Sequence, residues 1–302
     1  MKKIVFIAAA WLLMGLSADA QNGNAPSALV VIAHPDDEAM CSVTIYKITK
    51  ELKGTVDVAV ITNGEAGFKY STLAEAYYGV PLTDEKEGRK YLPQIRKQEL
   101  MNAGKIIGVS NIFFLDQPDA KFNLDERDPL DTSWNVPLVM AHLKDIFAHH
   151  HYDFVFCMLP VPATHAGHKA ASILALRTVQ AMPLAERPVI LGVSGSSKSD
   201  TTVRHFTQLK NYTETAVMGD TAMFHLDRTT PFGYNHALNY KMIATWEMAE
   251  HKSQGAYEMM LSRGGSDIEN FWLFKINNAQ AETKARQLFQ QLSVVPYPTK
   301  TY

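Results

Sequence analysis

The sequence predicts an α/β fold with a mostly parallel sheet, and two observations carry this prediction. Short apolar segments of strand type alternate with longer amphipathic segments of helix type, beginning with residues 29–33 and 38–52. Strands separated by helices of this length are typical of βαβ units, whose strands run parallel. The composition is that of an ordinary folded protein, because 46% of the residues are apolar and 20% are charged.

The expected elements follow one another in a regular order. Short apolar runs predict strands at 29–33, 56–61, 111–115, 154–159 and 189–193. Amphipathic spacing predicts helices at 38–52, 94–107, 138–148 and 169–181. Gly108 ends the second of these helices, because glycine readily adopts the left-handed conformation that closes a helix. No linker along this order separates two domains, so we expect a single domain over residues 28–302.

Two parts of the chain depart from this alternation. Residues 71–91 are rich in Tyr, Gly, Pro and charged residues, which predicts a long surface loop of the kind that often faces a substrate. The C-terminal part is less regular. There we expect two or three strands within 202–226, a long helix over 236–261 and an edge strand at 271–276.

Residues 1–20 have the pattern of a secretory signal peptide. A basic start precedes an apolar run from Ile4 to about Leu16, and the small residues Ala18 and Ala20 suit a cleavage site. The run is too short for a spanning helix, so we expect no membrane span after cleavage. The protein is then exported, either periplasmic or secreted; an uncleaved membrane anchor is the alternative.

Charge and cysteine content exclude some classes of function. The formal net charge of -2 argues against a nucleic-acid-binding surface, which needs a concentrated basic patch. Cys41 and Cys157 both lie in apolar segments, and we expect two buried free thiols, although export would permit a disulfide. The sequence carries no signal for the oligomeric state.

Polar side chains with catalytic potential follow two of the expected strands. His34, Asp36 and Asp37 come directly after the first strand, and His165 and His168 come shortly after the fourth. Ligands of an open α/β sheet bind outside the carboxyl ends of its strands, so these two groups can converge on one point. Three ligands drawn from histidine and carboxylate, with one position left for water, are the pattern of a catalytic zinc site.

Several motifs resemble those of one known family. Ala33-His34-Pro35-Asp36-Asp37-Glu38 resembles the AHPDDE signature of the PIG-L/LmbE-like zinc-dependent N-deacetylases, and His165-Ala166-Gly167-His168 resembles their later HxxH motif. Further similar segments are Thr62–Glu65, Arg96–Glu99, the loop around Asp119, and Lys241–Gln254. The resemblance touches most of residues 28 to about 255. It implies an LmbE-like fold, which is Rossmann-like with three layers.

The resemblance also implies a role for each residue of the motifs. His34, Asp37 and His168 would bind zinc, Asp36 would act as the general base, and His165 would assist at the tetrahedral intermediate. The family often carries Pro-Asp between the two histidines. This chain has Ala166-Gly167 there, a departure that puts the placement of the His165 side chain in doubt.

Physical chemistry refines these roles. Adjacent side chains are expected to diverge, so Asp36 is free to move protons if Asp37 is a ligand. A charged His165 would hydrogen-bond the oxyanion, and Glu38 would orient a ligand histidine. Arg96 and Asp119 suit hydrogen bonds to sugar hydroxyls or to the acetyl group; a surface helix charge and a turn aspartate are the alternative interpretations. The Lys241–Gln254 segment is interpreted as structural.

The sequence therefore predicts an enzyme, an exported metal-dependent N-deacetylase. It would remove acetyl from an N-acetylated amino sugar or glycoconjugate, of the N-acetylglucosamine type. Zinc is the expected metal, although iron or cobalt could occupy a His-Asp-His site, because such ligands are not selective. The alternatives are a metal-dependent amidase or deacylase acting on another small conjugate, and a non-catalytic carbohydrate-binding protein.

Overall fold

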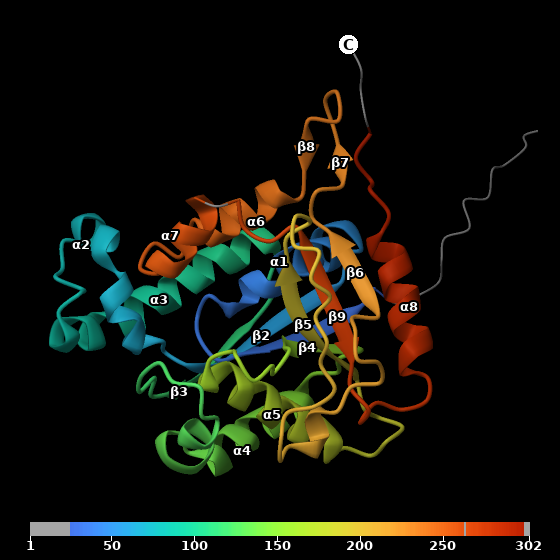
Figure 1. Cartoon of the computed structure of the whole chain (residues 1–302), viewed down its shortest axis with the longest axis horizontal. Coiled ribbons are helices and arrows are strands. Elements are labelled where there is room, and N and C mark those ends of the chain that lie inside the picture. The colour runs from blue at the N-terminus through green and yellow to red at the C-terminus, as the bar shows by residue number, and fades with distance from the viewer. Residues whose placement is uncertain (1–24, 263, 299–302) are drawn as a thin grey trace, which may run out of the picture.

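A seven-stranded sheet forms the centre of the molecule (Figure 1). The structure is a computed structural model that describes residues 25–262 and 264–298, so the expected signal peptide lies outside the described residues. The strands lie in the order β3-β2-β1-β4-β5-β9-β6. Their bounds are β1 Ser27–Ile32, β2 Thr55–Thr62, β3 Ile112–Gln117, β4 Phe154–Met158, β5 Val189–Ser196, β6 Phe224–Asp227 and β9 Ile268–Leu273. The strands β1 to β5 are parallel, which confirms the predicted fold class.

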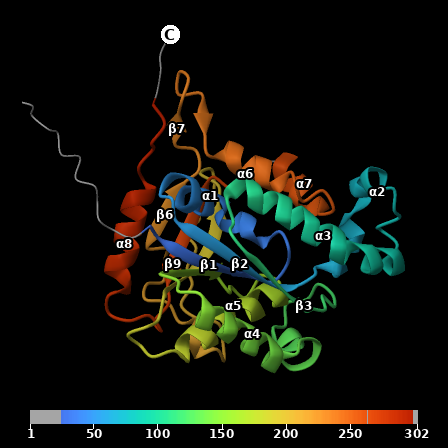
Figure 2. The same ribbon diagram turned by 180° about the vertical axis from the view of Figure 1, so that it is seen from behind.

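Both faces of the sheet are covered by other elements. Each face is apolar, because alternate residues of each strand point to opposite sides of the sheet. Along β1, Val30 and Ile32 pack in one apolar cluster, and Leu29 and Val31 pack in another. Figures 1 and 2 show α1, α3 and α6 on one side of the sheet and α4 and α5 on the other. The result is the expected three-layer arrangement.

The helices and the short hairpin complete the order of elements. The α-helices are α1 Ser42–Tyr46, α2 Thr72–Tyr78, α3 Glu85–Ile107, α4 Val136–His149, α5 Ala166–Gln180, α6 Lys241–Met248, α7 Gly255–Ser262 and α8 Ala281–Leu292. Short 3-10 or π turns are η1 Asp37–Cys41, η2 Lys47–Glu51, η3 Glu65–Tyr70, η4 Asp128–Ser133 and η5 Thr213–Thr215. The hairpin consists of β7 Pro231–Phe232 and β8 Leu238–Asn239.

The predicted loop over 71–91 is wrong. It contains α2 and the first residues of α3, which begins at Glu85 and continues through Pro93. The helix starts there because the Asp84 carboxylate accepts a hydrogen bond from the backbone N–H of Glu87 at 3.0 Å, the usual N-cap contact. The predicted helix over 38–52 is helical up to Glu51 but changes from η1 to α1 to η2.

The predicted long helix over 236–261 is also wrong, because the chain breaks between α6 and α7. Within the break, Ser253 donates from its backbone N–H and its hydroxyl to the Glu99 carboxylate, at 2.8 and 2.6 Å. His251 lies 2.7 Å from Glu38. These long-range contacts replace helical hydrogen bonds, and no local pattern predicts them.

The C-terminal strands differ from expectation as well. Instead of two or three strands, residues 202–226 contain the start of β6, the short turn η5 and residues of two isolated bridges. The predicted edge strand is β9, which pairs with β5 on one side and with β6 on the other, antiparallel to both. It is therefore an inner strand, because β6 adds to its outer side.

Cys41 and Cys157 are buried free thiols, as predicted. Burial raises the pKa of Cys157 to about 12, so it stays protonated and is not a nucleophile. Within residues 25–262 and 264–298, no helix combines the length and apolarity needed to cross a bilayer.

Candidate metal centre and active site

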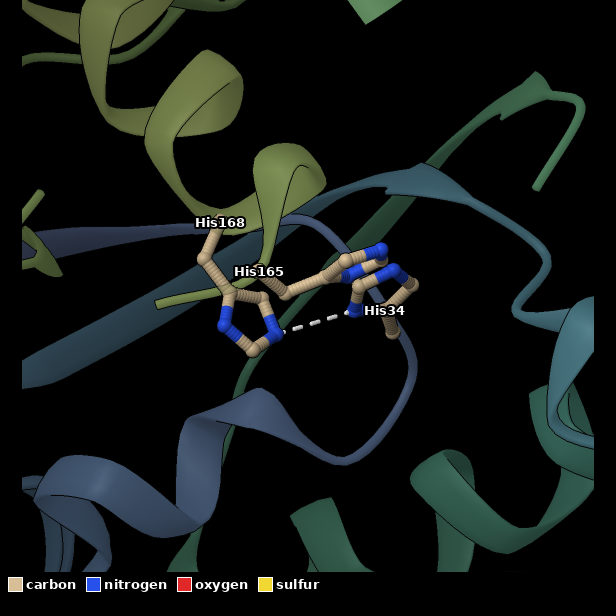
Figure 3. A group of neighbouring side chains, drawn as sticks. All are labelled: His34, His165 and His168. Carbon is tan, nitrogen blue, oxygen red and sulfur yellow. Dashed lines mark hydrogen bonds between the residues drawn. The ribbon is translucent and has the colours of Figure 1, made fainter. Parts of the chain in front are cut away.

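Three of the predicted residues converge at the carboxyl ends of β1 and β4. These strands are neighbours, with Val31 paired to Cys157. His34 lies just beyond β1, and His168 lies in the first turn of α5, beyond β4. Figure 3 shows the two imidazoles pointing toward each other, with His34 Nδ1 3.2 Å from His168 Nε2. Asp37 completes the group, 3.3 Å from His34 Nδ1 and 3.0 Å from His168 Nε2.

The backbone fixes the Asp37 carboxylate. Its Oδ2 accepts hydrogen bonds from the backbone N–H groups of Ala33 and His34, at 3.1 and 2.8 Å. Burial alone would raise the pKa of Asp37, but the charges of His168 and His34 hold it well below the usual range. Asp37 is therefore an anion at neutral pH and presents a fixed negative charge to the two imidazoles.

Each of the two imidazole rings, of His34 and His168, has a further contact through its other nitrogen, and this contact orients the ring. His168 Nδ1 lies 3.0 Å from the Thr164 hydroxyl, which leaves Nε2 to face Asp37. His34 Nε2 lies 3.9 Å from Asp119, on the side away from His168. Burial by itself would lower the pKa of His34, but Asp37 and then Asp119 outweigh it and raise the value to about 9. The two carboxylates therefore favour positive charge at this position.

These donors fit a divalent metal. Bonds of about 2.0–2.2 Å in a tetrahedral site place neighbouring donors about 3.3 Å apart, close to the distances observed among His34, Asp37 and His168. The geometry also permits other sets, since His165 and Asp36 each bring a ligand atom within 4.8 Å of a ligand atom of His34. Imidazole nitrogen and carboxylate oxygen together suit zinc, iron or cobalt.

Asp36 does not diverge from Asp37, contrary to expectation. A carboxylate oxygen from each, together with a His34 nitrogen, lies within 4.8 Å of the others. Their partners distinguish them, because Arg96 Nη2 lies 2.8 Å from Asp36, whereas the backbone holds Asp37. Burial raises the pKa of Asp36 above its usual value, Arg96 lowers it, and Asp37 raises it again.

Arg96 and Asp119 both line the cavity, and each has a contact that the sequence did not indicate. The Arg96 side chain is buried and also donates to the backbone carbonyls of Gly64 and Pro35. Asp119 accepts from the backbone N–H of Ala66 at 3.3 Å. Their predicted contacts with substrate stay predictions, and the structure adds a positioning role for each, toward Asp36 and His34 respectively.

His165 lies in the site, but not in the charged form that was expected. Its ring stacks between His34 and Phe122, with centroids 5.0 Å from each. Its Nε2 lies 3.3 Å from the Lys121 carbonyl oxygen. Burial first, and then the charges of His34 and His168, lower the pKa of His165 to about 4. It is therefore neutral at pH 7 in this environment.

Glu38 does not orient a metal-binding histidine, so that expectation is wrong. Its Oε1 lies 2.7 Å from His251 Nε2, which in turn lies 3.3 Å from Glu247. None of these three side chains is exposed to solvent. This buried Glu38–His251–Glu247 cluster joins the turn that carries Asp36 and Asp37 to α6.

A cavity of about 300 Å³ opens at the metal centre. Besides the predicted residues, its lining includes side chains that the sequence did not single out: Lys69, Tyr70, Phe122, Gln254 and Met260. Gln254 is the last residue of Lys241–Gln254, the segment that was interpreted as structural. That motif was the one sequence signal that could have pointed to Gln254 as a cavity residue. Lys69 and Tyr70 lie in η3, Met260 lies in α7 and Phe122 lies in a loop, and none of them belongs to a motif that the sequence singled out.

Comparisons with known proteins address the family and the fold. The family described as "PIG-L: GlcNAc-PI de-N-acetylase" matches residues 29–179, which is half of the chain. A Bacillus cereus protein named "Probable N-acetyl-alpha-D-glucosaminyl L-malate deacetylase 2" is 26% identical over 166 residues. That match spans 55% of this chain and 66% of the relative, just under two-thirds of its length.

Solved structures share the fold at low identity. The N,N'-diacetylchitobiose deacetylase of Pyrococcus horikoshii has a TM-score of 0.50 and 18% identity, over 83% of this chain and 84% of its own. A deacetylase of teicoplanin biosynthesis has a TM-score of 0.51 and 12% identity, over 82% and 97%. Sequence match, motif order and sheet topology agree, and the chain belongs to the PIG-L family.

Proposed function

We propose that this protein is a zinc-dependent N-deacetylase that removes acetyl from an N-acetylated amino sugar of the N-acetylglucosamine type. The observation that carries the proposal is the convergence of His34, Asp37 and His168, with contacts of 3.0–3.3 Å, beside Asp36 and a cavity. Membership of the PIG-L family adds support, as do the names of the family and of the Bacillus cereus relative, which describe deacetylases of amino-sugar compounds.

His34, Asp37 and His168 would hold the zinc and leave a position open toward the cavity. When bound, zinc lowers the pKa of a coordinated water to roughly 7 and so supplies a nucleophile at neutral pH. His34 is protonated in the metal-free environment, so metal binding would release a proton and depend on pH.

Asp36 would carry the proton. It lines the cavity, and its raised pKa suits a group that accepts a proton from water and passes it to the departing amine. Arg96, 2.8 Å away, holds the carboxylate in place and lowers its pKa against the effect of burial. His165, neutral in this environment, has a single N–H, which would have to leave the Lys121 carbonyl, 3.3 Å from its Nε2, to donate a hydrogen bond to the developing oxyanion.

The cavity lining suits a sugar ring. Asp119 and Arg96 supply polar contacts, whereas Tyr70 and Phe122 supply aromatic surface for the apolar face of the ring. The volume, about 300 Å³, is at the small end of ligand sites and fits one acetylated unit better than a long glycan.

The test combines metal analysis with an acetate-release assay. Purified protein should contain about one zinc per chain, and should release acetate from N-acetylglucosamine or its dimer, with loss on chelation and recovery on adding zinc. A zinc-loaded protein that releases acetate from neither substrate would contradict the proposed reaction. Activity that survives complete metal removal would contradict the proposed metal dependence.

The proposed location outside the cytoplasm depends on residues 1–20. N-terminal sequencing of the protein recovered from its native cells should give a start near Gln21. A start at Met1 in a cytoplasmic fraction would contradict export.

A further inference from the structure

We propose that the N-acetylated sugar carries an apolar aglycone, an aromatic or aliphatic group on its anomeric carbon, and that the mouth of the metal-centre cavity binds this group. The inference rests on the deacetylation proposed above and specifies the class of its substrate. The observation behind it is a change of character along one cavity, whose floor is polar and buried and whose mouth is exposed and mostly apolar.

The floor determines where an aglycone would lie. The acetyl group has to reach the metal centre, so the acetylated unit would lie against the buried side chains of the floor, among them Asp36, Arg96 and Gln254. At about 300 Å³ the cavity holds little more than this unit. Any group attached to the sugar would therefore leave through the mouth and contact the side chains there.

Three large apolar side chains lie at the mouth. Within the described residues the exposed part of the lining consists of Lys69, Tyr70, Phe122 and Met260. Tyr70, Phe122 and Met260 are 40%, 60% and 40% exposed, and they come from three separate segments: η3, the loop after β3, and α7. Single exposed apolar side chains are ordinary, but several gathered around one opening mark a binding surface.

The apolar surface continues beyond the cavity lining. Leu73 and Tyr77 are exposed and lie four residues apart, on one face of α2, which follows η3. Lys252 Nζ lies 5.5 Å from the centroid of the Tyr77 ring, and Gln254, two residues later, lines the cavity. Leu124, in the loop after β3, is exposed as well. An aglycone larger than one ring would therefore still find apolar side chains beside it.

Buried hydrogen bonds fix the α2 side of the mouth. Ser71, just before α2, donates from its hydroxyl to the Ser253 carbonyl at 2.8 Å. Tyr78, the last residue of α2, donates from its hydroxyl to the Glu99 carboxylate at 2.7 Å. Because Ser253 also donates to Glu99, the helices α2 and α3 and the link between α6 and α7 are joined at one point.

The Phe122 side is fixed in a similar way. Arg89 donates to two backbone carbonyls before Phe122, at 3.0 and 2.8 Å, and Lys169 donates to one after it. One face of the Phe122 ring stacks on His165, with 8° between the ring planes, so the opposite face is turned away from His165. An apolar ligand would meet surfaces that are already ordered, which lowers the entropic cost of binding.

The mouth suits an apolar group better than an anion or a second sugar. Its one exposed charged side chain among the described lining residues is Lys69, whose Nζ already lies 5.0 Å from the centroid of the Tyr70 ring, a cation–π contact. A second sugar would need hydrogen-bonding partners, but the carboxylates and the amide of the lining lie on the buried floor. An apolar group needs neither, and burying about 55 Å² of its surface would strengthen binding about tenfold.

The test compares glycosides of N-acetylglucosamine that differ only in the aglycone: methyl, butyl and phenyl, each in both anomeric forms. Titration calorimetry measures their affinities for the zinc-loaded Asp36→Asn protein, in which turnover is blocked. We expect the butyl and phenyl glycosides to bind about tenfold or more tightly than the methyl glycoside. Diacetylchitobiose and a phosphate ester of the sugar at its anomeric carbon are the polar comparisons, and both should bind more weakly than the phenyl glycoside.

Variants at the mouth locate the preference. Phe122→Ala combined with Met260→Ala should remove most of it, and both side chains are exposed, so the fold should tolerate the change. Phe122→Leu should keep the preference, because it retains apolar surface. Leu184→Ala, an exposed apolar change outside the cavity, is the matched control. The readout is the ratio of phenyl to methyl affinity, since Phe122 also contacts the sugar ring and its loss would weaken binding of every glycoside.

Several results would overturn the inference. Equal affinities for the methyl, butyl and phenyl glycosides would do so. Tightest binding of diacetylchitobiose would assign the mouth to a second sugar, and tightest binding of the phosphate ester would assign it to an anion. A preference that the Phe122→Ala/Met260→Ala variant retains in full would place the aglycone elsewhere.

Acetate release by the unaltered protein separates this failure from failure of the proposed function. Release from the methyl glycoside without any aglycone preference would leave deacetylation standing and remove the inference. An apolar preference in binding, without acetate release from any of the glycosides, would contradict the reaction and keep the ligand class. Absence of binding by every glycoside would contradict both.

Discussion

Asp36 and Asp37 are neighbours in the chain, yet their environments differ. Two backbone N–H groups hold Asp37, and His168 contacts its other oxygen at 3.0 Å. Asp36 faces the Arg96 guanidinium at 2.8 Å. A carboxylate held by backbone and facing imidazoles suits the proposed role of metal ligand, whereas one paired with a side chain at the cavity wall suits the proposed exchange of a proton.

The first prediction tests this division. Asp36→Asn keeps the shape of the side chain but removes its basicity, so turnover should fall by about 10²–10⁴-fold while zinc content stays near that of the unaltered protein. Elemental analysis and acetate release measure the two quantities. His34→Ala is the matched control and should lose zinc as well as activity. An Asp36→Asn protein with full turnover would exclude Asp36 as the base.

Glu247 illustrates a buried group whose charge state depends on folding. Burial, opposed by His251 and reinforced by the charge of Glu38, raises the pKa of Glu247 from 4.5 to about 8. Burial would lower the pKa of His251, but Glu38 and Glu247 raise it well above its usual value. At neutral pH the cluster therefore holds Glu247 protonated beside a charged His251, and carries little net charge.

The second prediction follows from linkage. Between pH 4.5 and about 8, folded Glu247 keeps a proton that the unfolded chain has lost, so stability must fall as pH rises through this window. His251 acts in the same direction. Its contribution to the stability of the fold is complete below pH 6.5, and it is lost as the pH rises through the pKa of His251 in the folded protein. Glu247→Gln cannot ionise, so it should flatten the decline in the free energy of unfolding.

Denaturant unfolding at several pH values measures this effect. Glu282→Gln, a partly exposed carboxylate in α8 paired with Arg286, is the matched control and should leave the pH dependence unchanged. A Glu247→Gln protein whose stability falls with pH as steeply as that of the unaltered chain would contradict the assignment.

At the scale of elements, one glycine in the turn after β2 makes room for the Arg96 side chain. Gly64 precedes η3 with φ 69°, and a Cβ there would overlap the Arg96 guanidinium. Arg96, in α3, in turn holds Asp36 after β1. The turn before η3, the helix α3 and the segment after β1 therefore meet at Gly64, where there is no room for a side chain.

The third prediction compares two glycines with the same backbone angle. Gly64→Ala should cost the left-handed penalty of about 1–2 kcal/mol and, by displacing Arg96, should also lower kcat with zinc retained. Gly79, at the end of α2, also has φ 69° but no atom within 4 Å of an added Cβ. Gly79→Ala should show the stability cost alone. Equal activity in the two variants would mean that Arg96 does not depend on the Gly64 turn.

At the scale of the whole molecule, the candidate metal site joins distant parts of one sheet edge. His34 and His168 are 134 residues apart and meet only because β1 and β4 are neighbours. A metal that binds both, and Asp37, binds the folded state far better than the unfolded chain. Metal binding and folding would therefore be linked.

The fourth prediction is that zinc stabilises the fold. At a free zinc concentration about a thousandfold above its dissociation constant, the gain is about 4 kcal/mol, and chelation should lower Tm accordingly. Scanning calorimetry with and without zinc measures the shift. His34→Ala should unfold at the same temperature in both conditions. A shift that persists in His34→Ala would place the stabilising metal at another site.

The sequence by itself determined the α/β class, because alternating apolar runs and amphipathic helices admit few other arrangements. It also determined the identity of the metal-binding candidates, since His34, Asp37 and His168 directly follow strands whose carboxyl ends meet at one edge. Their chemistry depends on residue type and on position after a strand, and both can be recognised in a sequence.

Only the tertiary structure decided which groups touch. It paired Arg96 with Asp36, turned Glu38 toward His251 and left His165 neutral beside His34. It also broke the 236–261 helix, where Ser253 binds Glu99, 154 residues earlier in the chain. These outcomes depend on burial and on partners far away in sequence, and local spacing contains neither quantity.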